Sequence, residues 1–192
     1  MPIAFRRKSV KLLLGAASCL TLVAAIWSAR LVHQRGLLVD DRKFADEIRN
    51  VSQKYGVDPQ LVRAVVFQES RFNPRAVGKK GEVGLMQVLR SGSVADWARI
   101  HRKNVPSHAA LMDVKLNLEI GVWYLSAALK RWKAYKHGVE LALVQYNAGE
   151  GRAARWKPES LDGEVISRIN ISSTGSYVAN IMNRYRKYNL GK

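Results

Sequence analysis

The chain contains little cysteine and little histidine. A single Cys among the 192 residues excludes an intrachain disulfide and a thiolate metal cluster. The four His residues are scattered through the sequence and show none of the paired spacing that zinc ligands adopt. We therefore expect no metal ion and no cofactor in this protein.

Acidic residues are scarce beside basic ones. The sequence has 15 Asp and Glu residues against 32 Lys and Arg residues, for a formal net charge of +17. Such a charge attracts anionic partners, and nucleic acid, anionic lipid headgroups and an acidic cell-wall polymer all fit. A basic surface with no specific ligand fits as well. The net charge therefore favours an anionic partner but does not distinguish among nucleic acid, lipid headgroups and a cell-wall polymer.

Long apolar runs are also few, and the one that stands out, Leu12 to Ala29, lies at the N-terminus. It is about the minimum length for a membrane-spanning helix. Positive charges flank it and are denser before it, which places the N-terminus inside and the remainder outside the membrane. We favour an uncleaved anchor over residues 1–31 and a linker over 32–40. The domain over 41–192 then lies in the periplasm, or otherwise outside the cytoplasmic membrane.

Two other interpretations of this segment stay open. One is a cleaved export signal, with cleavage after the small residues Val23-Ala24-Ala25. The other is lipidation at Cys19, although the Leu expected three residues before the Cys is absent. All three interpretations export the domain across the inner membrane. Export disfavours a nucleic-acid partner, and so does the lack of a basic recognition helix.

The rest of the chain predicts a single all-α domain. Its 47% hydrophobic content suffices for a core, and apolar residues recur at helical spacing. The main helices are expected at 41–55, 59–70, 113–133, 139–146 and 176–190, with shorter ones ending near His101 and at Arg152–Trp156. Residues 78–83 suggest a small hairpin-like excursion, and 147–151 suggest a turn. We expect seven or eight helices with little or no sheet.

Glu69 occupies an unusual position in this pattern. Asp58 and Pro59 form a strong helix start, which places Glu69 at the opposite end, where the helix dipole disfavours a negative charge. The helix end and desolvation by Val66 and Phe67 would both raise its pKa. A Glu that stays protonated near neutral pH can donate a proton to a leaving oxygen, as glycoside cleavage requires. The alternative is a partly exposed Glu at a frayed helix end.

Four ordered blocks of sequence support the first interpretation. They read Glu69-Ser70-x-Phe72-x-Pro74-x-Ala76, Gly84-Leu85-Met86-Gln87, Asn117-x-x-x-Gly121-x-x-Tyr124-Leu125 and Ala142-x-x-x-Tyr146-Asn147-Ala148-Gly149. Together they resemble the lytic transglycosylase domain of the lysozyme-like superfamily, from about Phe44 to the C-terminus. The resemblance implies a lysozyme-like, mainly helical fold. It also implies cleavage of the glycan strands of peptidoglycan, with Glu69 as the catalytic residue.

The expected substrate-binding residues surround that acid. Glycine at 84 lets the backbone approach a ligand closely, Met86 offers an adaptable wall or fills the core, and Gln87 offers an amide to a sugar or braces a loop. The resemblance places Tyr146 and Asn147 in the cleft near the acid, and Tyr177 within reach of it or in the packing stripe of the last helix. The full set is Ser70, Gly84, Met86, Gln87, Tyr146, Asn147, Ala148 and Tyr177.

The mechanism is expected to need only one carboxylate. Ordinary glycosidases use two, but here no second acidic residue stands in a motif directed at the cleft, and Glu82 has polar neighbours that suggest exposure. The resemblance implies that Glu69 protonates the glycosidic oxygen between N-acetylmuramic acid and N-acetylglucosamine. It then accepts the C6 hydroxyl proton as a 1,6-anhydro ring closes. A lysozyme-type hydrolase and a non-catalytic peptidoglycan-binding module of the same fold are the alternatives.

The sequence departs from the family pattern at several positions. Family members often have Ser where Gly78 stands and Ala where Glu82 stands. Many have Met-Pro soon after the Gln, where this chain has Leu89-Arg90. Many also have Glu-Thr-Arg before the position of Tyr177, where this chain has Ser-Thr-Gly at 173–175. These differences leave open how Tyr146 and Tyr177 are held. Partner proteins are not identified by the sequence.

Overall fold

The computed structural model describes residues 39–191. The expected membrane anchor over 1–31, with Cys19, and most of the expected linker over 32–40 lie outside the described residues. Within residues 39–191, no helix has both the length and the apolar character that crossing a membrane requires. The compact unit that carries the rest of the structure begins at Asp41.

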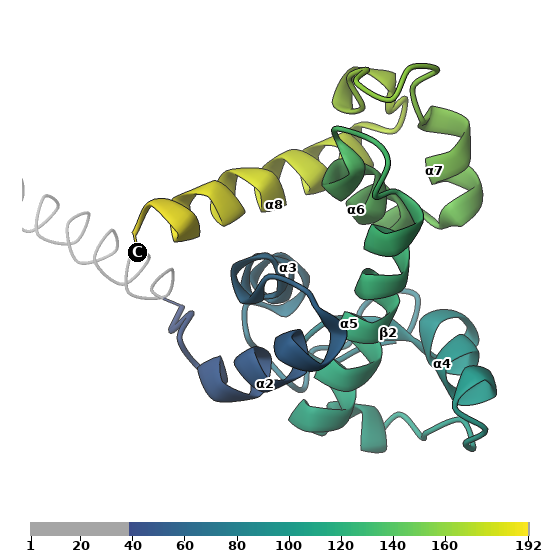
Figure 1. Cartoon of the computed structure of the whole chain (residues 1–192). Coiled ribbons are helices and arrows are strands. Elements are labelled where there is room, and N and C mark those ends of the chain that lie inside the picture. Colours follow the sequence, from purple (N-terminus) through teal and green to yellow (C-terminus); the bar gives the residue numbers. More distant parts are fainter. Residues whose placement is uncertain (1–38, 192) are drawn as a thin grey trace, which may run out of the picture. The chain divides into compact units, whose positions relative to one another are not determined.

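The described residues are mainly helical, as predicted (Figure 1). The seven α-helices are α2 (Ala45–Tyr55), α3 (Pro59–Ser70), α4 (Ala95–Ile100), α5 (Val114–Arg131), α6 (Gly138–Ala148), α7 (Glu150–Trp156) and α8 (Ser172–Leu190). Two short strands, β1 (Glu82–Val83) and β2 (Val88–Leu89), and three short segments, η1 (Arg90–Val94), η2 (Ala110–Met112) and η3 (Ile166–Arg168), complete the described part.

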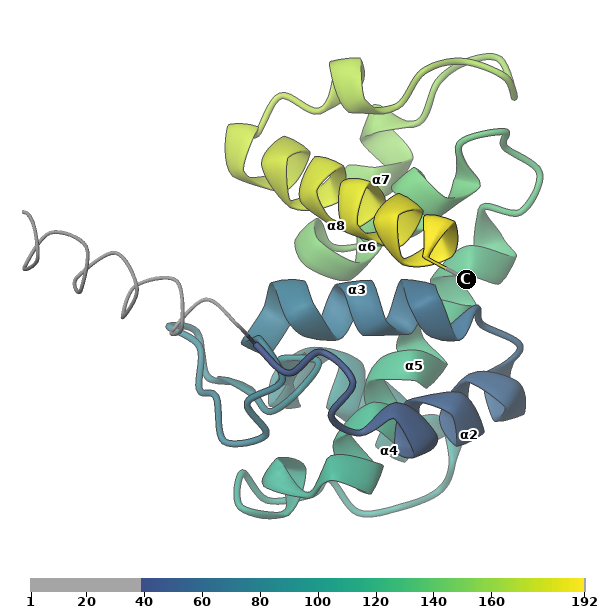
Figure 2. The same ribbon diagram turned by 90° about the vertical axis from the view of Figure 1, so that its left-hand side faces the viewer.

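Helix α3 lies at the centre of the unit. It packs against α8 on one side and against α2 on the other, and α5 in turn packs against α2 and α6. Figure 2 shows α3 between α8 above and α2 below. Residues Val62, Ala64, Val65 and Val66 of α3 are fully buried. Burial of an apolar side chain of this size stabilises the fold by roughly 1.5–3 kcal/mol, so the core fixes the helix that carries Glu69.

Local chemistry sets both ends of α3. The Asp58 side chain accepts a hydrogen bond from the Gln60 amide at 2.8 Å, and Pro59 occupies the first helical position, as the sequence predicts. At the other end, Arg71 and Phe72 both adopt positive φ, 50° and 62°. Non-glycine residues rarely do so, and burial of the Phe72 ring offsets the cost. The chain therefore turns sharply one residue after Ser70.

The strands β1 and β2 form the small hairpin expected near residue 78, which begins slightly later than predicted. They are antiparallel, with Glu82 opposite Leu89 and Val83 opposite Val88. Buried Asn117 of α5 holds this hairpin. Its amide nitrogen donates to the carbonyls of Val83 and Leu111, and its oxygen accepts from the Met86 amide, all within 2.7–2.8 Å.

Glycine is required at Gly84 and Gly121 for close packing around this hairpin. Gly84 has a φ of 79°, and a Cβ there would lie 2.2 Å from the Asn117 amide nitrogen. A Cβ at Gly121 would lie 2.5 Å from the sulfur of Met86. The second and third blocks of the sequence motif therefore pack against each other, and this explains their residue types.

Several predicted boundaries were wrong, and α2 begins at Ala45, four residues after its predicted start. Residues 147–151 do not form a turn, because α6 continues to Ala148 and α7 begins at Glu150. Only Gly149, with a φ of 89°, separates the two helices. Helix α8 begins at Ser172, four residues before the predicted start, because the Ile171 carbonyl accepts from the amides of Thr174 and Gly175 and opens the helix there.

Replacing Asn117 tests how much its three hydrogen bonds contribute. We expect Asn117→Ala to lower the free energy of unfolding by about 2–4 kcal/mol, because three buried backbone groups lose their partner. Chemical denaturation measures the change. Asn104→Ala, at an exposed loop residue, serves as the control and should stay within about 0.5 kcal/mol of the parent. Equal stability of the two variants would contradict this role.

Candidate active site

Helix α8 fixes Glu69 through a phenol. The Tyr177 hydroxyl donates to Glu69 Oε1 at 2.6 Å, and eight residues further along α8 the Tyr185 hydroxyl donates to Asp58 Oδ2 at 2.7 Å. The Arg184 guanidinium lies over the Phe67 ring, 3.2 Å from its centroid. Helix α8 thus contacts α3 at its first residues and at its last turn. Glu69 is held by side chains and is not at a frayed helix end.

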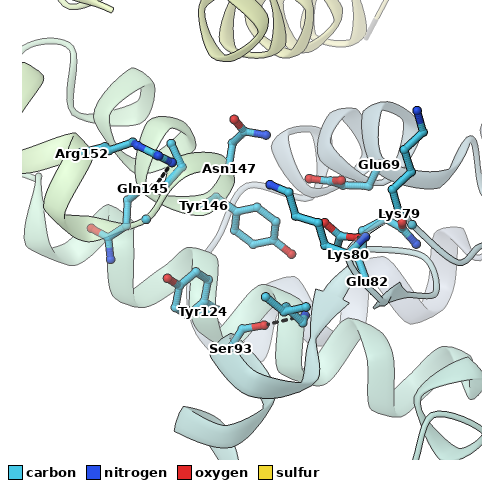
Figure 3. Close-up of a pocket in the computed structure, with 16 residues that line it drawn as sticks. Glu69, Lys79, Lys80, Glu82, Ser93, Tyr124, Gln145, Tyr146, Asn147 and Arg152 are labelled. Atoms are coloured by element: carbon cyan, nitrogen blue, oxygen red, sulfur yellow. Dashed lines mark hydrogen bonds between the residues drawn. The ribbon is translucent and has the colours of Figure 1, made fainter. Parts of the chain in front are cut away.

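A cavity of about 470 Å³ opens beside Glu69. Such a volume is within the usual range for ligand sites. Figure 3 shows its walls: Glu69 from α3, the loop before β1 with Lys79 and Lys80, Glu82 of β1, Tyr124 of α5, Tyr146 and Asn147 of α6, and Arg152 of α7. Three stretches far apart in the sequence, at 69–93, 124 and 145–152, therefore meet around this cavity.

The environment of Glu69 favours its protonated form. Its pKa is raised to about 7, mainly because burial disfavours the charged carboxylate, and further because the negative charge of Glu82 repels it. The hydrogen bond from Tyr177 acts in the opposite direction. The predicted upward shift of the Glu69 pKa is confirmed, and burial is its main cause. The effect of Glu82 was not foreseen.

Two buried phenols flank the acid. The Tyr146 hydroxyl donates to the Met86 carbonyl at 2.8 Å. Burial, followed by the charge of Glu69, raises the pKa of Tyr146 and of Tyr177 well above the usual value. Both phenols therefore remain neutral donors at physiological pH. The Tyr124 ring meets the Tyr146 ring edge-on at 5.7 Å and extends the aromatic wall.

Asn147 and Ala148 line the cavity next to Tyr146. The Thr174 hydroxyl of α8 donates to the Asn147 side-chain oxygen at 3.0 Å. Thr174 is buried and belongs to the segment before Tyr177 that departs from the family pattern. A threonine hydroxyl thus links α8 to the end of α6. The Met86 carbonyl holds the Tyr146 hydroxyl, and Glu69 holds that of Tyr177.

Gln87 braces a loop and also lines the cavity, and its contact with a sugar stays a prediction. Its amide nitrogen donates to the carbonyls of Gly84 at 2.9 Å and Ala76 at 3.2 Å. Both donors are therefore committed to the loop, and the amide oxygen is the group left to face a ligand. Gln87 itself has a φ of 47°, which the two hydrogen bonds help to maintain.

Four of the expected substrate-binding residues do not line the cavity: Ser70, Gly84, Met86 and Tyr177, the last of which contacts Glu69. The Met86 side chain is fully buried and packs against Gly121. Gly84 packs against Asn117. The Ser70 hydroxyl donates to the Leu85 carbonyl at 2.8 Å, which joins the end of α3 to the hairpin. These residues pack behind the cavity wall and support the segments that form it.

Glu82 corrects the sequence-based expectation. Its neighbours suggested an exposed side chain, yet it is partly buried, lines the same cavity as Glu69 and accepts from the Lys80 amide at 2.9 Å. The expectation that Glu82 is exposed and away from the cleft was therefore wrong, while the mechanism with one catalytic carboxylate stays a prediction. The sequence feature that could have indicated this position of Glu82 was the joint departure from the family pattern at Gly78 and Glu82. Among residues 39–191, no group of three or more His, Cys, Asp or Glu side chains is arranged to hold a metal ion.

Comparison with known proteins gives consistent matches. A family model described as the transglycosylase SLT domain matches residues 46–166. The chain is similar to the membrane-bound lytic murein transglycosylase C of Edwardsiella ictaluri, with 31% identity over 151 residues, 74% of this chain and 41% of that protein. It is also similar to the membrane-bound lytic murein transglycosylase E of Buchnera aphidicola, with 27% identity over 183 residues, 93% of this chain and 82% of that protein.

A solved structure shares the fold. An inactive mutant of the lytic transglycosylase Slt from Pseudomonas aeruginosa, with one glutamate replaced by glutamine, superposes with a TM-score of 0.68. Its identity is 22%, over 78% of this chain and 24% of that chain. At this identity the likeness concerns the fold. The chain spans less than half the length of the type C relative.

The raised pKa of Glu69 predicts a pH-dependent stability. Below about pH 4 the carboxyl is protonated in both states, but between the ordinary pKa and about 7 the unfolded chain releases the proton first. The free energy of unfolding therefore falls as pH rises, by up to about 3 kcal/mol. We expect Glu69→Gln to be the more stable protein near pH 8 and to match the parent near pH 4, as measured by denaturation at each pH.

The exposed residue Glu159 provides the control for that series. Glu159→Gln makes the same chemical change away from the cavity and should follow the parent at every pH. Parallel curves for parent and Glu69→Gln would show that the fold does not favour a protonated Glu69.

Proposed function

The chain belongs to the transglycosylase SLT domain family, and we propose that it is a lytic murein transglycosylase acting on the glycan strands of peptidoglycan. The scissile bond is the β-1,4 bond between N-acetylmuramic acid and N-acetylglucosamine. The observation that supports this most is the state of Glu69: a carboxyl with a pKa of about 7, on the wall of an open cavity and hydrogen-bonded to a neutral phenol.

The first step is proton transfer to the leaving oxygen. Glu69 holds a proton near neutral pH and donates it to the glycosidic oxygen as the bond to C1 of the muramoyl sugar breaks. Tyr177 fixes the carboxyl through Oε1 and leaves the other oxygen to face the cavity. The acetamido group of the substrate stabilises the positive centre at C1.

The second step returns a proton to Glu69. The carboxylate now accepts the proton of the C6 hydroxyl while that oxygen bonds to C1 and closes the 1,6-anhydro ring. No water is consumed, and Glu69 ends in its starting state. One residue can serve as acid and then as base because its pKa lies close to neutral pH. Attack within one sugar unit also benefits from a high effective concentration.

Similar proteins support this assignment. The Slt mutant from Pseudomonas aeruginosa is inactive with one glutamate replaced by glutamine, the substitution that would remove the proton donor at Glu69. The relatives of types C and E are named as membrane-bound lytic murein transglycosylases. The cavity volume of about 470 Å³ and its mixed polar and aromatic walls suit a segment of sugar polymer.

We also propose the location of the enzyme. Residues 1–31 anchor it in the inner membrane, 32–40 link the anchor to the domain, and 41–192 form the catalytic domain in the periplasm. The membrane-bound relatives support an anchored form. The net charge of +17 adds attraction to an anionic wall or membrane surface.

A lysozyme-type hydrolase is the second candidate, and Glu82 is the observation that favours it. Glycosidases that use water have two carboxylates beside the scissile bond, and this cavity has both Glu69 and Glu82 on its walls. A non-catalytic binding module has less support, because nothing in such a module calls for the protonated, phenol-bound Glu69.

Replacing the acid tests the proposed function. We expect Glu69→Gln to bind peptidoglycan like the parent but to lose turnover by about 1,000-fold or more, because no proton reaches the leaving oxygen. Release of soluble fragments from purified sacculi measures turnover, and co-sedimentation measures binding. Glu159→Gln is the control. Turnover of Glu69→Gln comparable with that of the parent would remove Glu69 from the mechanism.

The products separate the two enzyme classes. We expect mass spectrometry of the digest to show 1,6-anhydro-muramoyl ends with no label when the reaction runs in water enriched in heavy oxygen. Reducing ends that carry the label would instead identify a hydrolase.

A further inference from the structure

The Glu82 carboxylate occupies space that a side chain at residue 78 would need. A Cβ built on Gly78 would lie 2.4 Å from Glu82 Oε2 and 2.8 Å from Gln87 Oε1, both closer than real side chains approach. The backbone of Gly78 does not have the positive φ that by itself favours glycine. A side chain at this position would therefore have to displace the Glu82 carboxylate and the Gln87 amide, which links the departures at Gly78 and Glu82.

The backbone around Glu82 is fixed on both sides. Its carbonyl accepts from the Gly78 amide at 2.8 Å, and Glu82 pairs with Leu89 in the hairpin. Its carboxylate accepts from the Lys80 amide at 2.9 Å. Asn117 holds the neighbouring residue Val83 through its carbonyl. The carboxylate is thus a built part of the wall and not a mobile surface group.

The carboxylates of Glu69 and Glu82 belong to the same cavity (Figure 3). The other titratable and charged groups there are Lys79 and Lys80 from the same loop, Tyr124 and Tyr146 from α5 and α6, and Arg152 from α7. Tyr177 of α8 does not line the cavity but contacts Glu69 directly. The cations favour an ionised Glu69, as does the hydrogen bond from Tyr177. Burial and the charge of Glu82 act in the opposite direction and prevail, since the pKa of Glu69 is raised.

We propose that Glu82 is a positioning residue that acts through Glu69. Its carboxylate, seated in the space that Gly78 leaves, opposes a second negative charge in the cavity and keeps the proton on Glu69. This inference rests on the proposed role of Glu69 as the acid. It goes beyond that role because it gives a second residue a part in setting the pH range of the enzyme. Burial supplies most of the effect, and Glu82 extends the range in which the proton donor is available to higher pH.

The pH profile of turnover tests the proposal on the full chain. Removing the charge of Glu82 lowers the pKa of Glu69, so the alkaline limb of the kcat profile should move to lower pH. We expect Glu82→Gln to shift that limb by about half a unit, which is about a threefold loss of kcat near pH 8. Turnover near pH 5.5 should stay close to that of the parent.

Two further variants link the effect to Gly78. A methyl group in Gly78→Ala must displace the Glu82 carboxylate, so this variant should shift the limb in the same direction. In Glu82→Gln with Gly78→Ala the shift should equal that of Glu82→Gln alone, because both changes act on one group. Glu159→Gln removes a charge of the same sign from the exposed surface and should leave the profile unchanged.

The outcomes distinguish this inference from the proposed function. An unshifted limb in Glu82→Gln, with Glu69→Gln inactive, would overturn the role of Glu82 and leave the acid in place. Loss of turnover at every pH in a folded Glu82→Gln that still binds sacculi would also overturn it, since Glu82 would then act on the substrate. Full activity of Glu69→Gln would instead overturn the proposed function.

Discussion

The hydrogen bond from Tyr177 to Glu69 is the contact on which the site depends. It joins the first turns of α8 to the last turn of α3, two segments 108 residues apart. The second phenol contact, from Tyr185 to Asp58, lies at the other end of α3. Two neutral donors therefore hold the helix that carries the acid. A carboxyl fixed in this way can approach a bridging oxygen in a defined direction, which is a condition for general acid catalysis.

The site balances opposite electrostatic effects. The protein is strongly basic, which suits an anionic polymer or surface, yet the acid needs its proton near neutral pH. Burial of Glu69 and the charge of Glu82 raise its pKa, while Tyr177 opposes them and still fixes the side chain. A cavity with cations at Lys79, Lys80 and Arg152 would by itself favour the ionised acid. In our proposal the negative charge of Glu82 opposes this effect and helps to keep the proton on Glu69.

Residues of the family motif divide into two physical groups. Glu69, Tyr146 and Asn147 line the cavity and can meet a substrate. Asn117, Gly121, Gly84 and Met86 pack behind it and fix the hairpin that brings Glu82 to the wall. Sequence patterns do not separate these groups, because a glycine needed for close packing and a glycine needed for ligand approach look alike. Met86 was accordingly expected either at the wall or in the core, and the structure places it in the core.

The sequence by itself determined the helices and the start of α3 at Asp58 and Pro59, because these follow from residue spacing and capping within short segments. The four motif blocks led to Glu69 as the proposed acid through their resemblance to a family. The sequence also carried the direction of the pKa shift of Glu69, since apolar neighbours in the same helix already imply burial. Only the tertiary structure decided that Glu82 shares the cavity, that Thr174 ties α8 to Asn147, and that α6 continues through Ala148. Each of these depends on contacts between segments distant in the chain, or on the single backbone angle of Gly149, and local sequence patterns do not record such distances.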